Sequence, residues 1–550
     1  MVQSSSKRVL ITASWLLPLT LLAHIRSPFS AEAGLLPSVK AEYISQRVDR
    51  QNEADLSLQS YSVAPALTAF FNSRTIDASF SGTHTYLKRD NEALSTENNF
   101  STYRSFLTYS LLEDLITFNA QSSMQYRPDG GQNFILANFI SNPDALAKTT
   151  NHNLAATLET TQGDYINTLL NASYTQLKVT RAQSATGNDI DSKNASVELG
   201  LSNGDNASFV YWQADASLQE SRRGNNAYGN FRSINSNAEA DFMMLPWLGI
   251  RLSGTTERYD TSAPDSAFDS SRQYNTYGAG LTYRQSPYRV ISVTLNGVDS
   301  QTDSADDDNF IAADVKWAFS NRTGFFLRLN KRFFGRSAQS ALRYNSKYFR
   351  STLGYTETVT NATRLLSSVE DLGLFVCPAS FTDISECQQP DSVDYTPQPG
   401  ETLAQFSQNV FELDDNIILR KALNAAIGYS FSRLQFNLSL RRAEDDYLDL
   451  ERLRSFDSVT LTGSFAASRD TKIVATLQYS DSEGQSQELI QQESTAKRIS
   501  LDTRHTLSDH LSAYLTLTIV DQEGDFETFG FFGNNFTDTQ LALGLRYQLQ

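Results

Sequence analysis

The sequence of 550 residues lacks the features that mark most enzymes and helical membrane proteins. After the N-terminus it has no run of about 20 apolar residues, which excludes a bundle of membrane-spanning helices. Lys and Arg number 46 against 62 Asp and Glu, giving a net charge of -16. This acidic balance argues against nucleic acid as a partner, because phosphate binding needs clustered cations. With 13 prolines and 27 glycines, the chain is not a low-complexity sequence either.

Aromatic residues are plentiful and argue for a folded chain. They make up 11% of the sequence, well above the level in chains that lack a core. No long amphipathic helix and no linker divides the sequence after residue 33. We therefore expect a single domain over residues 34–550.

The first 33 residues have the layout of a secretory signal peptide. Lys7 and Arg8 precede the apolar run from Val9 to Ala23, and an A-x-A site at 31–33 predicts cleavage before Gly34. An uncleaved membrane anchor is the alternative, although the run of 15 residues is short for a span. The pattern favours export.

Beyond residue 33, apolar and polar residues alternate with a period of two. The alternation is clear over Ile116 to Tyr126, Leu434 to Leu440, Leu511 to Ile519 and Leu541 to Leu549. Successive side chains of a strand point to opposite faces, so each segment has one apolar and one polar face. The polar positions hold mainly Ser, Thr, Asn and Gln, and the segments run about 10 residues. This is typical of outer-membrane strands, with lipid on one face and water on the other.

Short turns alternate with longer polar stretches along the chain. The longer stretches include Asp90 to Asn98, Arg127 to Thr150 and Asp481 to Thr495. The tight turns fall near residues 72–74, 113–114, 162–164, 203–204, 245–247, 286–287, 321–324, 346–347, 432–433, 469–470 and 508–509. These eleven turns join 22 strands, and one further strand at each end gives 24. An even count with both ends on the short-turn, periplasmic side is what single-chain bacterial barrels require.

The fold class predicted is therefore all-β, a single large transmembrane antiparallel β-barrel of about 24 strands (22 to 26) in the outer membrane of a Gram-negative bacterium. Its sheet must close, because lipid offers no partners to unpaired backbone groups. A barrel this wide leaves an aqueous lumen unless it is plugged. The strand pattern begins soon after Gly34, which leaves no room for an N-terminal plug and disfavours a TonB-dependent receptor.

Setting the apolar face outward predicts which charged side chains face the lumen. The lumen-facing candidates are Arg328, Arg332, Arg343, Arg441 and Arg504. One interpretation is ordinary lumenal salt bridges and hydration, each contributing little. The other is a track for a polar or anionic polymer, since guanidinium binds carboxylate or phosphate bidentately. On the outer face, Trp317, Phe319, Phe465, Tyr479 and Tyr547 suit a membrane-interface girdle or ordinary strand packing.

The longest gap between strands covers about 361–421 and holds both cysteines of the protein, Cys377 and Cys387. Because the periplasm is oxidising, we predict that they form a disulfide. A metal-binding pair is the alternative, but no histidine lies nearby in the sequence. Pro390, Pro397 and Pro399 predict an irregular segment rather than strands.

Catalytic and cofactor motifs are missing from the sequence. His84, His152, His505 and His510 are scattered without metal-ligand spacing, and there is no phosphate loop or dinucleotide fingerprint. We expect no enzyme activity, no cofactor and no metal.

The late part of the chain resembles the outer-membrane β-barrel proteins associated with the PEP-CTERM/exosortase system. The resemblance rests on the loop with Cys377 and Cys387, on Phe411-Glu412-Leu413 to Leu419-Arg420-Lys421, and on the hairpin from Ala422 to Arg442. That hairpin contains Gly428-Tyr429-Ser430 and Leu438-Ser439-Leu440. The overall length from signal peptide to C-terminal strand is also similar, and no functional residue is carried over from the family.

The resemblance implies a role in the cell envelope or in exopolysaccharide export. We therefore expect a wide pore or envelope component, with outer-membrane lipid, exopolysaccharide and its export machinery as partners. The alternatives are a non-conducting outer-membrane scaffold and a soluble exported all-β protein that binds carbohydrate.

Overall fold

The computed structural model describes the chain from residue 31 to residue 549 with internal gaps. The described ranges are 31–51, 54–90, 97–112, 115–128, 146–160, 163–181, 189–224, 230–262, 271–300, 308–361, 374–378, 401–405, 416–448, 452–485, 491–525 and 534–549. The predicted signal peptide falls almost entirely outside these ranges. Strand β1 begins at Glu32, two residues before the predicted cleavage point.

Twenty-four strands form one antiparallel sheet. The first seventeen are β1 (Glu32–Arg50), β2 (Leu56–Asn72), β3 (Ile76–Arg89), β4 (Glu97–Leu111), β5 (Ile116–Pro128), β6 (Leu146–Thr160), β7 (Ile166–Thr180), β8 (Ile190–Asn203), β9 (Val210–Arg222), β10 (Asn230–Leu245), β11 (Leu248–Thr261), β12 (Ser271–Ser286), β13 (Arg289–Ser300), β14 (Phe310–Ser320), β15 (Thr323–Arg332), β16 (Gly335–Asn345) and β17 (Phe349–Thr360). The last seven are β20 (Ile418–Phe431), β21 (Leu434–Tyr447), β22 (Arg452–Ala466), β23 (Thr471–Gln485), β24 (Gln491–Ser508), β25 (Leu511–Gly524) and β26 (Phe536–Gln548).

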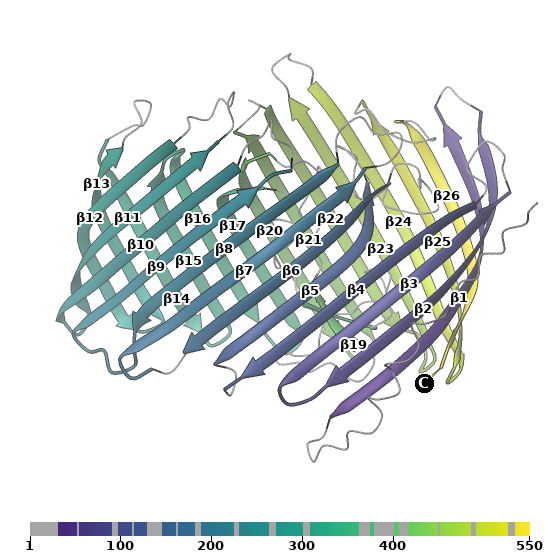
Figure 1. Cartoon of the computed structure of the whole chain (residues 1–550), viewed down its shortest axis with the longest axis horizontal. Helices are drawn as coiled ribbons and strands as arrows, with labels where there is room; N and C mark the ends of the chain where they lie inside the picture. Colours follow the sequence, from purple (N-terminus) through teal and green to yellow (C-terminus); the bar gives the residue numbers. More distant parts are fainter. Residues whose placement is uncertain are drawn as a thin grey trace, which may run out of the picture.

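The sheet closes on itself to make a barrel. β1 pairs with β2 on one side and with β26 on the other, the latter from Ser38 opposite Gln548 to Arg50 opposite Phe536. Every other strand of the sheet pairs with its neighbours in chain order, β17 pairing directly with β20. Figure 1 shows the resulting barrel, with β10–β13 at the left edge and β24–β26 with β1 at the right edge.

The predicted fold class and strand number are confirmed, and all eleven tight turns fall between consecutive strands. The strands are longer than the expected 10 residues, reaching 19 in β1 and 18 in β24. β15 and β16 are joined by Phe333 and Phe334 alone, a tight connection that was not among the predicted turns. We call the end of the barrel with the tight turns the short-turn end and the other the long-loop end.

A second, separate sheet lies within the long connection between β17 and β20. β18 (Leu374–Pro378) pairs with β19 (Glu401–Gln405), two short strands that were not predicted, while Pro390, Pro397 and Pro399 lie outside the described residues. The connection is also shorter than expected, because β20 already begins at Ile418. Cys377 lies in β18, whereas Cys387 lies outside the described residues, so the disulfide stays a prediction. No helix in the described ranges is long and apolar enough to cross a membrane.

The outer face of the barrel is apolar and exposed. Leu154 is 57% exposed, Tyr277 63% and Ile311 70%, and such side chains alternate with inward polar ones on every wall. Among the predicted interface aromatics, Phe319, Phe465, Tyr479 and Tyr547 are exposed, while Trp317 is half-buried next to Arg289. An apolar surface this extensive is stable only against lipid.

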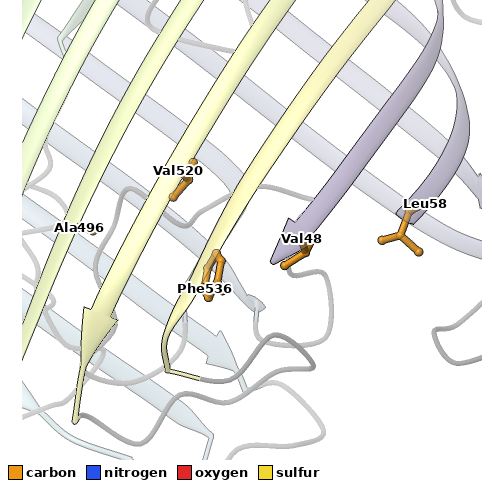
Figure 2. Close-up of a cluster of buried hydrophobic side chains, with 5 residues drawn as sticks. All are labelled: Val48, Leu58, Ala496, Val520 and Phe536. Carbon is orange, nitrogen blue, oxygen red and sulfur yellow. The ribbon is translucent and has the colours of Figure 1, made fainter. Parts of the chain in front are cut away.

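Inside the closing strands, apolar side chains pack at the long-loop end. Figure 2 shows Val48, Leu58, Ala496, Val520 and Phe536, which come from β1, β2, β24, β25 and β26. All five are buried and lie at even-numbered positions, on the face opposite to exposed residues such as Leu541 and Leu543. The cluster therefore stabilises the closing pair of strands from within.

Candidate functional site

The lumen wall is the candidate functional site, because the sheet register gathers the polar side chains there. Directly opposed residues of an antiparallel pair share a face. Asp314 on β14 is opposite Ser292 on β13 and Arg328 on β15, and none of the three shares a face with the exposed Val293. The inner wall is therefore polar at these three neighbouring positions.

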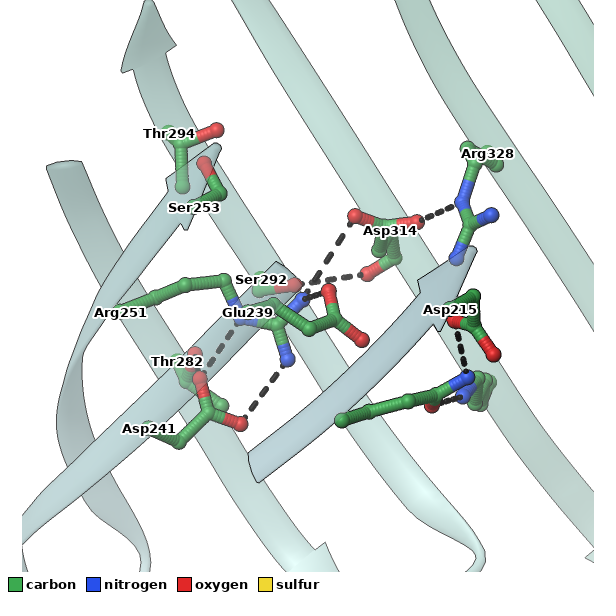
Figure 3. A network of polar contacts seen from close by, with 12 residues as sticks. Asp215, Glu239, Asp241, Arg251, Ser253, Thr282, Ser292, Thr294, Asp314 and Arg328 are labelled. Atoms are coloured by element: carbon green, nitrogen blue, oxygen red, sulfur yellow. Dashed lines mark hydrogen bonds and ion pairs between the residues drawn. The ribbon is translucent and has the colours of Figure 1, made fainter. Parts of the chain in front are cut away.

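A dense hydrogen-bonded network joins inward side chains of β10–β15 (Figure 3), and β10–β13 form the left edge of the barrel in Figure 1. Asp241 on β10 is 2% exposed and accepts hydrogen bonds from Nε of Arg251 at 2.6 Å and from the Thr282 hydroxyl at 2.7 Å. Arg284 donates to the same carboxylate at 3.2 Å. Three strands, β10 to β12, are thus joined through one buried carboxylate.

The network continues across the lumen from β11 to β15. Arg251 also donates to Glu239 at 2.9 Å and lies 3.5 Å from an oxygen of Asp314. Asp314 in turn accepts from Nε of Arg328 at 2.8 Å. Because β12 and β13 lie between β11 and β14 in the sheet, the Arg251–Asp314 contact crosses the interior of the barrel.

Two further contacts cross the same sector. Nε of Arg332 on β15 lies 2.6 Å from Glu257 on β11, and another guanidinium nitrogen donates to the Tyr259 hydroxyl at 2.8 Å. Lys316 on β14 donates to the side-chain oxygen of Gln213 on β9 at 3.4 Å. These contacts join β9–β11 to β14–β15 at more than one level along the strands.

An apolar cluster joins the same walls at the long-loop end. Phe231 and Tyr259 of β10 and β11 pack with Val359 and Leu419 of β17 and β20 and with Ile417. The β15–β16 turn supplies Phe333, whose ring centroid is 4.6 Å from that of Tyr259, and Phe334. Asn361 also donates to the Ser221 hydroxyl of β9 at 2.8 Å. We call the sector enclosed by β9–β17 the narrow lobe.

The network contains charges of both signs. Arg251, Arg284, Arg328 and Arg332 form ion pairs with Glu239, Asp241, Glu257 and Asp314, and Lys316 donates to Gln213. A buried network with paired charges of both signs holds walls together rather than offering a free charge to a ligand.

The five lumen-facing candidates do not form one site. Arg328 and Arg332 lie in the narrow lobe, bound to Asp314 and Glu257. Arg343 lies on β16 opposite Thr352, and Arg441 lies on β21 with an exposure of 6%. Arg504 lies on β24 opposite Lys472 and Tyr514. No local pattern in the sequence shows which distant strand an inward acid will meet, so the pairs of this network could not be predicted.

His84, His152 and His505 lie on β3, β6 and β24, and His510 lies in the turn between β24 and β25. His152 on β6 has Nδ1 2.8 Å from the Ser122 hydroxyl, but this pair lies on the outer face with the exposed Phe118 and Leu154. Across the described ranges, no group of three or more His, Cys, Asp or Glu side chains is arranged to hold a metal ion.

The closed ring, the apolar exterior and the polar interior define a large β-barrel protein of the Gram-negative outer membrane. The alternative of a soluble exported protein is inconsistent with that exterior. No family model and no curated protein sequence matches the chain.

Among solved structures, the chain is similar to the siderophore receptor PirA from Acinetobacter baumannii, at 8% identity and a TM-score of 0.41, over 94% of this chain and 80% of that one. It is also similar to the FrpB iron transporter from Neisseria meningitidis (F5-1 variant, apoprotein form), at 8% identity and a TM-score of 0.41, over 93% and 81% of the two chains.

Proposed function

We propose that the protein provides a passage for a polar polymer, an exopolysaccharide, across the outer membrane. The observation that carries the proposal is the 24-stranded ring with a polar inner wall. A ring of this size is wide enough for an aqueous channel. The resemblance to barrels of the PEP-CTERM/exosortase system supports the choice of exopolysaccharide over a small solute.

The wall is suited to a hydrated chain of sugars. Inward Ser, Thr, Asn and Gln side chains exchange hydrogen bonds with hydroxyl groups without fixing any one of them. The protein then acts as a conduit rather than as an enzyme, with no cofactor and no metal. Its partners in this role are the outer-membrane lipid and the machinery that delivers the polymer.

A second candidate, a non-conducting envelope scaffold, is favoured by a different observation. The contacts across the narrow lobe and the buried inner-face clusters at the long-loop end fill part of the interior. If the remaining lumen is also closed, the barrel holds other envelope components without passing a polymer.

Single-channel recording of the refolded protein in planar bilayers separates the two functions. A variant that lacks residues 377–387 is measured beside the intact chain, and heat-modifiable gel mobility verifies that both barrels are folded. Large steps in the intact protein, reduced by added polysaccharide, support the passage. Steps only in the deletion variant identify a gate in the β17–β20 connection. Folded barrels that never conduct overturn the passage and favour the scaffold.

A further inference from the structure

Four exposed cations form a patch on the outer face of β7, β8, β9 and β10, which are neighbours in the ring (Figure 1). Each lies between two buried residues of the chain, as Lys193 does between Ser192 and Asn194. Their side chains therefore point away from the lumen. We call these four the outer basic patch: Lys178, Lys193, Arg222 and Arg232.

The patch lies at the outer limit of the lipid-facing surface. Its members are 10 to 13 positions from the short-turn ends of their strands. At about 3.3 Å per residue and a strand tilt of about 40°, they lie roughly 25–33 Å above those ends, where an apolar band about 25 Å tall has finished. Val197 and Leu218, nearer the short turns, are exposed on the same face. Short turns mark the periplasmic side, so the patch lies at the headgroups of the outer leaflet.

The carboxylates within the patch are fewer than its cations. Arg222 pairs with Glu220 at 2.8 Å, and the Lys178 ammonium lies 3.8 Å from Asp191. Exposed pairs of this kind contribute little and are open to competition. The other two members of the patch have no side-chain hydrogen bond or ion pair within the described part of the chain.

The strand register adds to the excess of positive charge. Lys193 is directly opposite Arg222. Like charges in this position destabilise a sheet, and an anion bound between them removes that cost. Arg232 is opposite Glu220 on one side and Asp260 on the other, but both carboxylates pair with arginines of their own strands.

The connections at this end of β7–β10 do not balance the charge. In the sequence, the β7–β8 connection carries Arg181 and Asp189, and the β9–β10 connection carries Arg223 as its one charged residue. The long-loop end of the outer face is different on β23 to β25, where it holds Lys497 beside Asp481, Glu483, Glu493, Asp521 and Glu523. The basic patch is therefore a feature of one sector, in a chain whose net charge is -16.

We propose that the outer basic patch binds the phosphate groups of glycolipids in the outer leaflet. Guanidinium binds phosphate oxygens bidentately, and the lysines act beside it as point charges. A lipid fits better than a soluble anion, because the patch is continuous with the lipid-facing surface below it and lies where basic side chains meet anionic headgroups. Binding at this surface is independent of conduction through the lumen.

The test is native mass spectrometry of the full-length protein in detergent, titrated with lipid A that carries two phosphates and with the same lipid after phosphatase treatment. The wild type is expected to bind the phosphorylated lipid about tenfold more tightly, with a preference that falls as salt is added. K193Q/R232Q removes the two cations without a carboxylate partner and is expected to lose the preference, whereas K193R/R232K keeps it. The control K421Q/K497Q removes the same charge from two outward lysines that are paired with acids, and it is expected to bind like the wild type.

Three outcomes would overturn the inference. The first is equal binding of the two lipids by the wild type. The second is a K193Q/R232Q barrel that is folded by heat-modifiable mobility and still binds like the wild type, or a control that loses the preference equally. The third is displacement of the lipid by millimolar inorganic phosphate, which would identify a site for a free anion instead of a lipid surface.

Discussion

Arg332 and Glu257 form an ion pair at 2.6 Å, although β12, β13 and β14 separate their strands in the sheet. The pair holds two walls of the barrel at a distance that the ring alone does not impose. The Arg332 guanidinium also donates a hydrogen bond to the Tyr259 hydroxyl at 2.8 Å. The pair therefore closes off part of the narrow lobe, in which β12 to β14 form the wall that connects the two strands.

Glu257→Ala is expected to lower the free energy of unfolding by about 1.5–3 kcal/mol, the usual worth of a hydrogen bond to a charged group. Urea titration of the refolded protein in lipid vesicles measures the change. Glu220→Ala is the matched control, because its pair with Arg222 is exposed on the outer face and contributes less than about 1 kcal/mol. Equal effects of the two substitutions contradict the bridging role of Arg332.

The buried pair of Arg420 and Asp445 provides a second test. Both side chains are 3% exposed, and Nε of Arg420 lies 2.6 Å from Asp445. Arg420→Met leaves a buried carboxylate without its partner and is expected to cost about 3–5 kcal/mol. The double variant R420M/D445L is expected to recover most of that loss. A double variant as unstable as the single one contradicts this account.

Leu154→Arg tests the assignment of the outer face. Leu154 is 57% exposed near the middle of β6, and a cation there is expected to cost about 2–4 kcal/mol in a bilayer. Asn153→Arg changes the preceding residue, whose side chain lies on the inner face, and this substitution is expected to be tolerated. Folding yields in vesicles, measured by heat-modifiable mobility, compare the two. The assignment is wrong if Asn153→Arg is the more damaging change.

Gly335 begins β16 with φ at 111°, and no atom lies within 4 Å of the position that a Cβ would take. Gly335→Ala therefore adds backbone strain without a clash, and we expect a loss of about 1–2 kcal/mol. Gly324→Ala is the control, because that site is equally open and its φ is ordinary. Urea midpoints that shift by the same amount in both variants exclude backbone strain as the cause.

The predicted disulfide is tested by peptide mapping of the unreduced protein. A linked peptide containing Cys377 and Cys387 is expected, and it is expected to disappear on reduction. Because β18 belongs to a sheet separate from the barrel, reduction is expected to leave the heat-modifiable mobility unchanged. Free thiols in the unreduced protein disprove the disulfide.

The sequence was sufficient to predict the ring, because period and turn chemistry are local signals. The turns at 321–322 and 432–433, for example, lie between strands whose alternation runs up to the turn on both sides. The strand number follows from counting such turns. The β15–β16 connection was not predicted, since Phe333 and Phe334 are both apolar and only Gly335 indicates a turn.

The contacts across the lumen had no signal of this kind. Arg332 was predicted to face inward, but its partner Glu257 lies 75 positions away in the chain. Which inward residues meet depends on the cross-section of the barrel, and the alternation pattern contains no information about that shape.

The pairing of β1 with β26 has a consequence for how the protein is made. Each other strand of the sheet joins one that is near in sequence, whereas Ser38–Arg50 must wait for Phe536–Gln548. Until then the sheet has two open edges, whose unpaired backbone groups lipid cannot satisfy. Bringing together segments so far apart in the chain is slow. The seam is therefore expected to be the last contact to form, and nascent barrels need protection at both edges until it does.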